Sequence, residues 1–194
     1  MPATALGLVL GTAFAAGLNV YAAVATLGLL QRFGVVQLPQ SLHPLAHPVV
    51  LGIAITLYVI EFFADKVPVI DHVWDAIHTF IRPPAAAILA FAAVSGVGEP
   101  WRIGAALLAG TVALASHGSK ATTRVAVNTS PEPFSTWAMS LGEDALAISL
   151  TWLAVTHPLV ALALALVLTI AAVWIVMTLL RLARRTLGRF RATR

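Results

Sequence analysis

Charge is scarce in this sequence, and that scarcity decides the class of protein. Only 10% of the 194 residues are charged, while 59% are hydrophobic, and the mean hydropathy is +0.91. A soluble domain carries about 25% charged residues, so this chain lacks the polar surface that would keep it in water. Its apolar segments are long enough to cross a bilayer as helices, and alternating strand patterns are absent. We therefore predict an all-α, polytopic membrane protein.

Cysteine is absent altogether, which excludes disulfides, thiolate metal sites and cysteine nucleophiles. The sequence also contains no nucleotide-binding loop, no Rossmann fingerprint and no nucleophile elbow. Serine and histidine occur, but no spacing between them singles out a catalytic triad. Enzymatic catalysis is therefore not the favoured interpretation, although the sequence does not decide the question.

The basic residues are concentrated at one end of the chain. The net charge is +4 and the isoelectric point is about 10.4, values that would suggest nucleic acid if the charge were spread out. Six of the twelve basic residues, however, lie at positions 181, 184, 185, 189, 191 and 194. We predict a single transmembrane domain over 1–180 and a basic cytoplasmic tail over 181–194 that binds anionic lipid. No nucleic-acid partner is expected, and a homo-oligomer is left open.

Hydropathy divides the chain into about six spans. They cover roughly residues 4–30, 49–63, 85–94, a segment from 103, 137–155 and 159–180. The first is either one long tilted helix or two half-helices that meet near Gly17 and Asn19, and the fourth is expected to be interrupted at 117–120. With the basic tail inside, both termini are cytoplasmic. Ten Lys and Arg residues then lie inside against Arg32 and Arg102 outside, a strong positive-inside bias.

A weak internal repeat suggests two inverted halves. Gly11-Thr12 with Gly17-x-Asn19 resembles Gly110-Thr111 with Gly118-x-Lys120. Repeats of three spans would be inverted in the membrane, an arrangement in which secondary transporters often pair broken helices. Small apolar residues also match one another by chance, so the sequence leaves the 3+3 repeat open.

The charge that is present gathers in one stretch. Four of the eight acidic residues lie between positions 61 and 83. Pro68 breaks the preceding helix, and we predict a short amphipathic or re-entrant helix over 70–81. Four polar residues share one face of this helix: Asp71, Asp75, His78 and Arg82. Because charge is costly at a membrane boundary, this concentration indicates a functional site.

Two distant polar segments are predicted to meet near the cytoplasmic face. The first contains Glu61, Asp65, Lys66, Asp71, Asp75, His78 and Arg82. The second contains His117, Lys120, Arg124, Asn128, Glu143 and Asp144. Asn19, in the first apolar segment, is expected to make an interhelical hydrogen bond rather than to bind a ligand. We take all of these as candidate ion-binding or substrate-binding residues, although paired charges at the level of the lipid headgroups would give the same pattern.

Three carboxylates are the strongest candidates for an ion site. Glu61, Asp65 and Asp144 each occur beside apolar residues of a predicted helix. A carboxylate in such surroundings needs a partner, a bound ion or a proton. The leading hypothesis is therefore a small secondary transporter or ion-coupled exchanger, in which these residues bind a cation or protons.

Two other uses of the same residues stay open. A divalent cation is one, held by three residues at helical spacing: Asp71, Asp75 and His78. No recognised zinc signature accompanies them. The phosphate of an anionic substrate or lipid headgroup is the other, held by four cations: Lys66, Arg82, Lys120 and Arg124. Such a protein would be a membrane-embedded enzyme or binder acting on phospholipids or polyprenyl phosphates.

Four motifs carry a resemblance to a known family. They are G-x-N-x-Y at 17–21, E-x-x-A-D-K-x-P-x-x-D-x-x-W-D-x-x-H-T at 61–79, H-G-x-K-A-x-x-R-x-x-x-N-x-S-P-E-P at 117–133, and Glu143-Asp144. Together they resemble the bacterial inner-membrane family called domain of unknown function 4126, over nearly the whole chain except the basic tail. The resemblance implies a place in the bacterial inner membrane, but no settled activity.

A fainter similarity is to cation/proton exchangers whose two repeats each carry an E-x-G-D-K-[ST] motif. Here the segment 61–66 has one extra residue and Ala64 in place of glycine, and a second copy would be only Gly142-Glu143-Asp144. These departures make the likeness an analogy with ion exchange rather than membership of that group.

Overall fold

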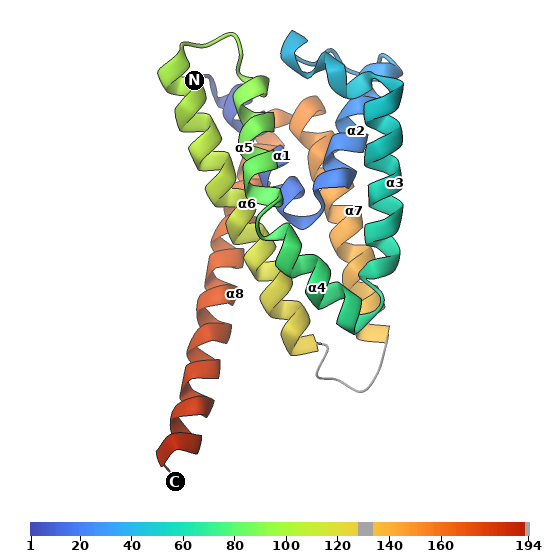
Figure 1. Ribbon diagram of the computed structural model, residues 1–194. Coiled ribbons are helices and arrows are strands. Elements are labelled where there is room, and N and C mark those ends of the chain that lie inside the picture. Colours follow the sequence, from blue (N-terminus) through green and yellow to red (C-terminus); the bar gives the residue numbers. More distant parts are fainter. Residues whose placement is uncertain (128–133, 193–194) are drawn as a thin grey trace.

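The computed structural model describes residues 1–127 and 134–192, and every regular element in that part of the chain is helical. In chain order the elements are α1 (Ala3–Leu18), α2 (Val20–Arg32), the 3₁₀ helix η1 (Gln40–Ala46), α3 (Pro48–Ala64), α4 (Pro68–His78), α5 (Arg82–Ala93), α6 (Glu99–Val127), α7 (Phe134–Thr156) and α8 (Pro158–Ala192). They form an elongated bundle (Figure 1). The prediction of an all-α fold is confirmed.

Two helices, α7 and α8, are long and apolar enough to cross a membrane. Two bent pairs join them if each pair is counted as one broken span. These are η1 with α3, bent by 66°, and α4 with α5, bent by 46°. The described residues therefore contain two to four candidate spans by length and composition, fewer than the six that hydropathy predicted.

The first apolar segment consists of two half-helices, because the chain turns back at Asn19. This residue is extended, with φ −152° and ψ 101°, and separates α1 from α2. Residues from 4–8 and from 36–39 line the same cavity, so α2 returns to the end of the bundle at which α1 begins. At 1.5 Å per residue, α1 and α2 are roughly 24 and 20 Å long, shorter than the ~30 Å hydrocarbon core of a bilayer.

With the reversal at Asn19, the start of α1 and the end of α8 lie at opposite ends of the bundle. The N-terminus lies at the end where α5 leads into α6, and α8 runs to the other end (Figure 1). The prediction that both termini lie on one side assumed that the first apolar segment crosses the membrane. In the structure, α1 and α2 form a hairpin that begins and ends at the same end of the bundle, so this segment does not cross it.

The predicted interruption of the fourth span is wrong. α6 is continuous from Glu99 to Val127, and the side chains at 116, 117, 120 and 124 are buried against other helices. Groups on other helices form hydrogen bonds and ion pairs with these polar side chains, so the polar residues do not interrupt the backbone of α6. The break at Asn19 therefore has no counterpart in α6, although the inverted repeat relied on one.

α4 has its polar face inside and its apolar face outside. Asp71 and Asp75 are buried, whereas Val69, Val73 and Ile77 are each more than half exposed. A helix on the surface of a soluble protein has the opposite arrangement. An apolar exterior over a polar interior is expected where the surroundings are lipid.

The bounds of two elements differ modestly from the prediction. α4 begins at Pro68 and ends at His78, and the two prolines expected to end it lie in the first turn of α5. Proline is favoured there because the first helical N–H groups have no intrahelical partner. The predicted basic tail continues α8 as a helix as far as Ala192, and its binding to anionic lipid stays a prediction.

α1 is the centre of the bundle, and it packs against α5, α6, α7 and α8. Small residues make this packing close. A Cβ atom added at Gly11 would lie 2.8 Å from the Ala154 Cβ, and one added at Gly17 would lie 2.5 Å from the Ala113 carbonyl oxygen. Such close helix packing through small residues is typical of membrane proteins.

Candidate functional site

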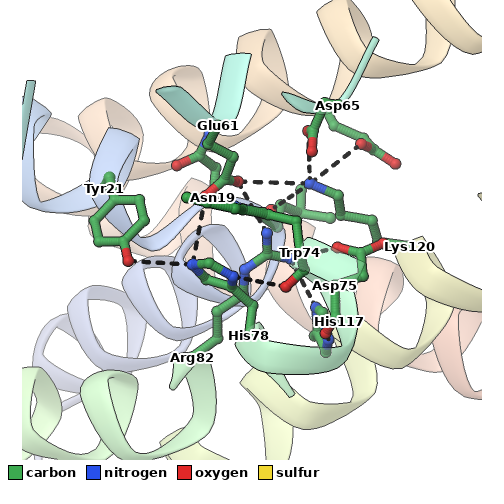
Figure 2. A network of polar contacts seen from close by, with 12 residues as sticks. Asn19, Tyr21, Glu61, Asp65, Trp74, Asp75, His78, Arg82, His117 and Lys120 are labelled. Carbon is green, nitrogen blue, oxygen red and sulfur yellow. Dashed lines mark hydrogen bonds and ion pairs between the residues drawn. The ribbon is translucent and has the colours of Figure 1, made fainter. Parts of the chain in front are cut away.

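The two polar segments meet inside the bundle, beside the turn between α1 and α2 (Figure 2). Eleven of the predicted site residues are buried: Asn19, Glu61, Asp65, Asp71, Asp75, His78, Arg82, His117, Lys120, Arg124 and Asp144. The Glu143 side chain, 12% exposed, lies at the edge of this group. We call these residues the polar network. Asn128 lies outside the described residues.

The end of α1 supplies acceptors to two cations of the network. Arg82 Nη1 donates to the Gly17 carbonyl at 3.1 Å, and Lys120 Nζ donates to the Leu18 carbonyl at 3.2 Å. The last carbonyls of a helix lack intrahelical partners and carry the negative end of its dipole. The break at Asn19 therefore creates a site for positive charge in the interior of the bundle.

Asn19 joins α2 to α7. Its Oδ1 accepts a hydrogen bond from the Ala22 N–H at 2.9 Å and so caps α2. Its Nδ2 donates to Asp144 Oδ1, also at 2.9 Å. The expected interhelical hydrogen bond is confirmed, and its partner is one of the candidate ion-binding carboxylates.

Arg82 is paired with Glu61 and fixes the tautomer of His117. Its Nη2 donates to Glu61 Oε1 at 2.9 Å, and its Nη1 lies 2.7 Å from His117 Nδ1. Arginine has no acceptor, so His117 Nδ1 must accept this bond and Nε2 carries the proton. That N–H faces the Asp75 carbonyl at 3.0 Å and the Thr79 hydroxyl at 2.9 Å. His117 is therefore a neutral member of the network.

Lys120 and Arg124 share a carboxylate oxygen. Lys120 Nζ and Arg124 Nη2 each lie 2.9 Å from Asp65 Oδ2. Lys120 Nζ is also 3.6 Å from Glu61 Oε1 and from Glu143 Oε2. Within the described residues, Arg124 makes ion pairs with three carboxylates: Asp65, Asp71 and Glu143.

His78 contacts aromatic residues that were not among the predicted site residues. Its Nδ1 donates to the Trp74 carbonyl at 2.8 Å, and its ring stacks on the Trp74 indole at a centroid distance of 4.8 Å. Its Nε2 faces the Tyr21 hydroxyl at 3.1 Å and lies 4.0 Å from Glu61 Oε2. Tyr21 and Trp74 both occur in the motifs noted in the sequence, and that signal could have identified them.

A family model described as Domain of unknown function (DUF4126) matches residues 6–178. The chain belongs to this family. The match includes the whole polar network and confirms the resemblance that the motifs carry. The description names no activity. Neither the curated proteins nor the solved structures include a match to the chain.

Carboxylates outnumber cations in the polar network of this DUF4126 protein. It contains six acidic side chains, of which five are buried: Glu61, Asp65, Asp71, Asp75 and Asp144, with Glu143 at the edge. It contains three permanent cations: Arg82, Lys120 and Arg124. His117 adds no positive charge in the hydrogen-bonding pattern described above, and the six carboxylates stay in excess when His78 is counted as a cation. Residues 128–133, NTSPEP, contain no Lys or Arg by sequence.

Several carboxylate oxygens are buried without a hydrogen bond among the described residues. They are Glu61 Oε2, Asp65 Oδ1, both oxygens of Asp75, and Asp144 Oδ2. Asp75 comes no closer than 3.7 Å to Arg82 Nη1. Asp144 has its Asn19 hydrogen bond but no ion pair within 4 Å in the described part of the chain. Asp75 and Asp144 are thus the carboxylates whose charge is least compensated.

Lys66 lies beside the network rather than inside it. Its Nζ donates to the Phe62 carbonyl at 2.8 Å and stands 3.1 Å from the centre of the Phe62 ring. Burial lowers the pKa of this ammonium, and the carboxylates of Asp144 and Asp65 oppose that effect. With Lys66 added to Arg82, Lys120 and Arg124, the six carboxylates still exceed the four cations by two.

No group of three His, Asp or Glu side chains arranged to hold a metal ion is found within residues 1–127 and 134–192. The three residues proposed from sequence have separate neighbours. Asp71 pairs with Arg124, Asp75 faces Arg82, and His78 faces Tyr21. The divalent-cation assignment to Asp71, Asp75 and His78 stays a prediction.

Proposed function

We propose that this DUF4126 protein is a small secondary transporter or ion-coupled exchanger, and that its polar network binds and releases protons or a cation. The observation that carries the proposal is the excess of buried carboxylates. Uncompensated charge is costly in a medium of low dielectric constant, and ionisable groups within a membrane domain typically mark ion or proton pathways. Protons on some of the carboxylates, or a cation among them, would remove the excess.

Discontinuous helices give the proposal a second line of support. Secondary transporters commonly place their sites where a broken helix offers free backbone groups near the middle of the membrane. Here the turn at Asn19 offers carbonyls to Arg82 and Lys120, and the bend between α4 and α5 lies beside Arg82. The site is thus built where the backbone of two segments is interrupted.

The proposal includes a revised topology for the inner membrane. Arg32 bonds to Ala46 and Arg102 to Phe91, at the end of the bundle that holds the N-terminus. The other basic residues of the described chain lie in the polar network, in the α3–α4 turn or towards the end of α8. By the positive-inside rule the end of α8 faces the cytoplasm. We infer that α3, α4 with α5, α7 and α8 cross the membrane and that α1 and α2 form a re-entrant hairpin. We infer that α6 also crosses, although it is not among the candidate spans, because it packs against α5 and α8.

Proton flux into proteoliposomes tests this function. Vesicles loaded with a pH-sensitive dye should show protein-dependent acidification when an inside-negative potential or an opposing cation gradient is imposed. Glu61→Gln and Asp65→Asn should each slow the flux roughly tenfold or more, because each removes a carboxylate that would carry the proton or cation. A tenfold loss of rate corresponds to ~1.4 kcal/mol in the barrier. Glu99→Gln is the matched control, since Glu99 is exposed at the start of α6. Flux at the wild-type rate in both buried variants would rule out these assignments.

Headgroup binding, the alternative function, requires cations that a phosphate can reach. Arg82, Lys120 and Arg124 are each no more than 3% exposed and already pair with carboxylates. The carboxylate excess would also repel a phosphate. This alternative predicts a co-purifying lipid that Lys120→Ala or Arg124→Ala releases, and such a lipid would favour it over ion transport.

A further inference from the structure

A groove on the side of the bundle leads to the polar network. It has a volume of about 220 Å³ and is bordered by α6, α7, α8 and the end of α1. Most of its wall is apolar, with Leu146, Leu168 and Ile175 among the lining residues. α6 and α7 pack sparsely against each other, so the groove lies where these two helices stand apart.

The polar part of the groove consists of one carboxylate and a row of α6 residues. Glu143, Ser119, Lys120 and Thr123 line it. The Glu143 side chain is 12% exposed, whereas the Lys120 side chain beside it is fully buried, with its Nζ turned to Asp65 and Leu18. Glu143, which shares its charge with Arg124 and Lys120, is therefore the charged side chain that a ligand in the groove can reach.

Glu143 has an oxygen to spare for a ligand. Its Oε2 accepts from Arg124 and lies 3.6 Å from Lys120, and no hydrogen bond or ion pair to its Oε1 is found among residues 1–127 and 134–192. Behind Glu143 lies the rest of the network, with more carboxylates than cations. A positive ligand at Glu143 would reduce that imbalance, and an anion there would increase it.

We propose that this groove binds a hydrophobic organic cation, with its apolar body against α7 and α8 and its charged centre beside Glu143. Apolar walls with a few placed polar groups are the usual form of a small-molecule site, and the charge of Glu143 selects the sign of the ligand. The claim that this cation is a substrate of transport depends on the function proposed above. The claim that it binds in the groove does not depend on that function.

Equilibrium binding of tetraphenylphosphonium to the detergent-purified protein tests the inference. The wild type should bind the radiolabelled cation saturably, at fixed pH and without any gradient. Glu143→Gln should weaken binding roughly tenfold or more. Ala171→Phe, which places a ring in the groove from α8, should do the same without changing any charge. Ala163→Phe, the same substitution at an exposed position of α8, is the matched control and should bind as the wild type does.

A probe of equal shape and opposite charge completes the test. Tetraphenylborate, measured separately, should show no saturable binding that Ala171→Phe abolishes. The inference is overturned if tetraphenylphosphonium does not saturate, if Ala171→Phe and Ala163→Phe bind alike, or if the borate occupies the groove, as an anionic lipid would. If Glu143→Gln fails to fold, Ala171→Phe and the borate still decide. The binding measurement uses no gradient, so it is independent of the proton-flux measurement. A failure to bind the cation would overturn this inference without contradicting proton flux, and an absence of proton flux would contradict the proposed function without contradicting cation binding.

Discussion

Replacing Arg82 by glutamine should destabilise the protein by ~3–5 kcal/mol, the cost expected when one partner of a buried ion pair is removed. Arg82 is fully buried and holds Glu61 at 2.9 Å, the Gly17 carbonyl and His117. Among the described residues, the substitution leaves the Glu61 carboxylate with Lys120 at 3.6 Å as its one permanently charged partner, and with His78 at 4.0 Å. Unfolding of the purified protein, followed by intrinsic fluorescence in a denaturant series, measures the effect.

Two companion variants make the Arg82 result specific. Arg102→Gln removes an arginine at the far end of the bundle, where it contacts only the Phe91 carbonyl and ring in the described residues, and it should cost much less. The double variant Glu61→Gln/Arg82→Gln should recover part of the loss, because it no longer leaves a carboxylate unpaired. Equal stability of Arg82→Gln and Arg102→Gln would show that the buried ion pair is not needed for folding.

Gly17→Ala is expected to have the second large effect, ~2 kcal/mol or more, in the upper part of the range for overpacking a core. A Cβ atom at this position would lie 2.5 Å from the Ala113 carbonyl oxygen and 2.8 Å from the Ser116 Cβ. Two of the three nearest atoms belong to the backbone of α6, so the clash cannot be relieved by turning a side chain. α1 and α6 would have to separate, which would also move the Gly17 carbonyl away from Arg82.

Gly104→Ala provides the control for this substitution. Gly104 is in α6, and nothing lies within 4 Å of the position that its Cβ would take. Alanine there should be neutral or stabilise the helix by up to ~1 kcal/mol. If both glycine variants unfold at the same denaturant concentration, the close approach of α1 to α6 does not limit stability.

The class of the protein and several chain breaks could be predicted from the sequence. Scarce charge and long apolar segments indicate membrane helices, and Pro68 marks the start of α4. The continuity of α6 could not be predicted. His117, Gly118 and Lys120 look like a polar interruption, but His117 bonds to Thr79 and Lys120 to Asp65. Those partners come from other parts of the chain, and no local pattern contains them.

The hairpin of α1 and α2 shows a second limit of sequence reasoning. An apolar segment that crosses once and one that turns back at Asn19 have the same composition. Gly28 packs closely against Leu45 and Gly7 against Pro158, and such contacts between distant residues are not visible in the sequence of the segment. The predicted topology counted this segment as one crossing, and the side on which each terminus lies stays a prediction.

The members of the polar network were largely predictable, but their pairing was not. Charge among apolar residues identified Glu61, Asp65 and Asp144. Helical spacing placed Asp71 and Asp75 on one face. The sequence did not show that Asp71 pairs with Arg124 while Asp75 forms no hydrogen bond through its carboxylate in the described structure. That difference depends on the position of α6 relative to α4, which is a property of the folded bundle.

Infrared absorption of the protein in lipid tests the central claim, that the buried carboxylates exceed the cations available to them. In a neutral buffer with choline as the only cation, the wild type should show the C=O stretching band of a protonated carboxylic acid. Asp144→Asn should weaken that band, because Asp144 has no ion pair in the described residues, and Glu99→Gln should leave it unchanged. A wild-type spectrum in which every carboxyl group is ionised in that buffer would contradict the claim.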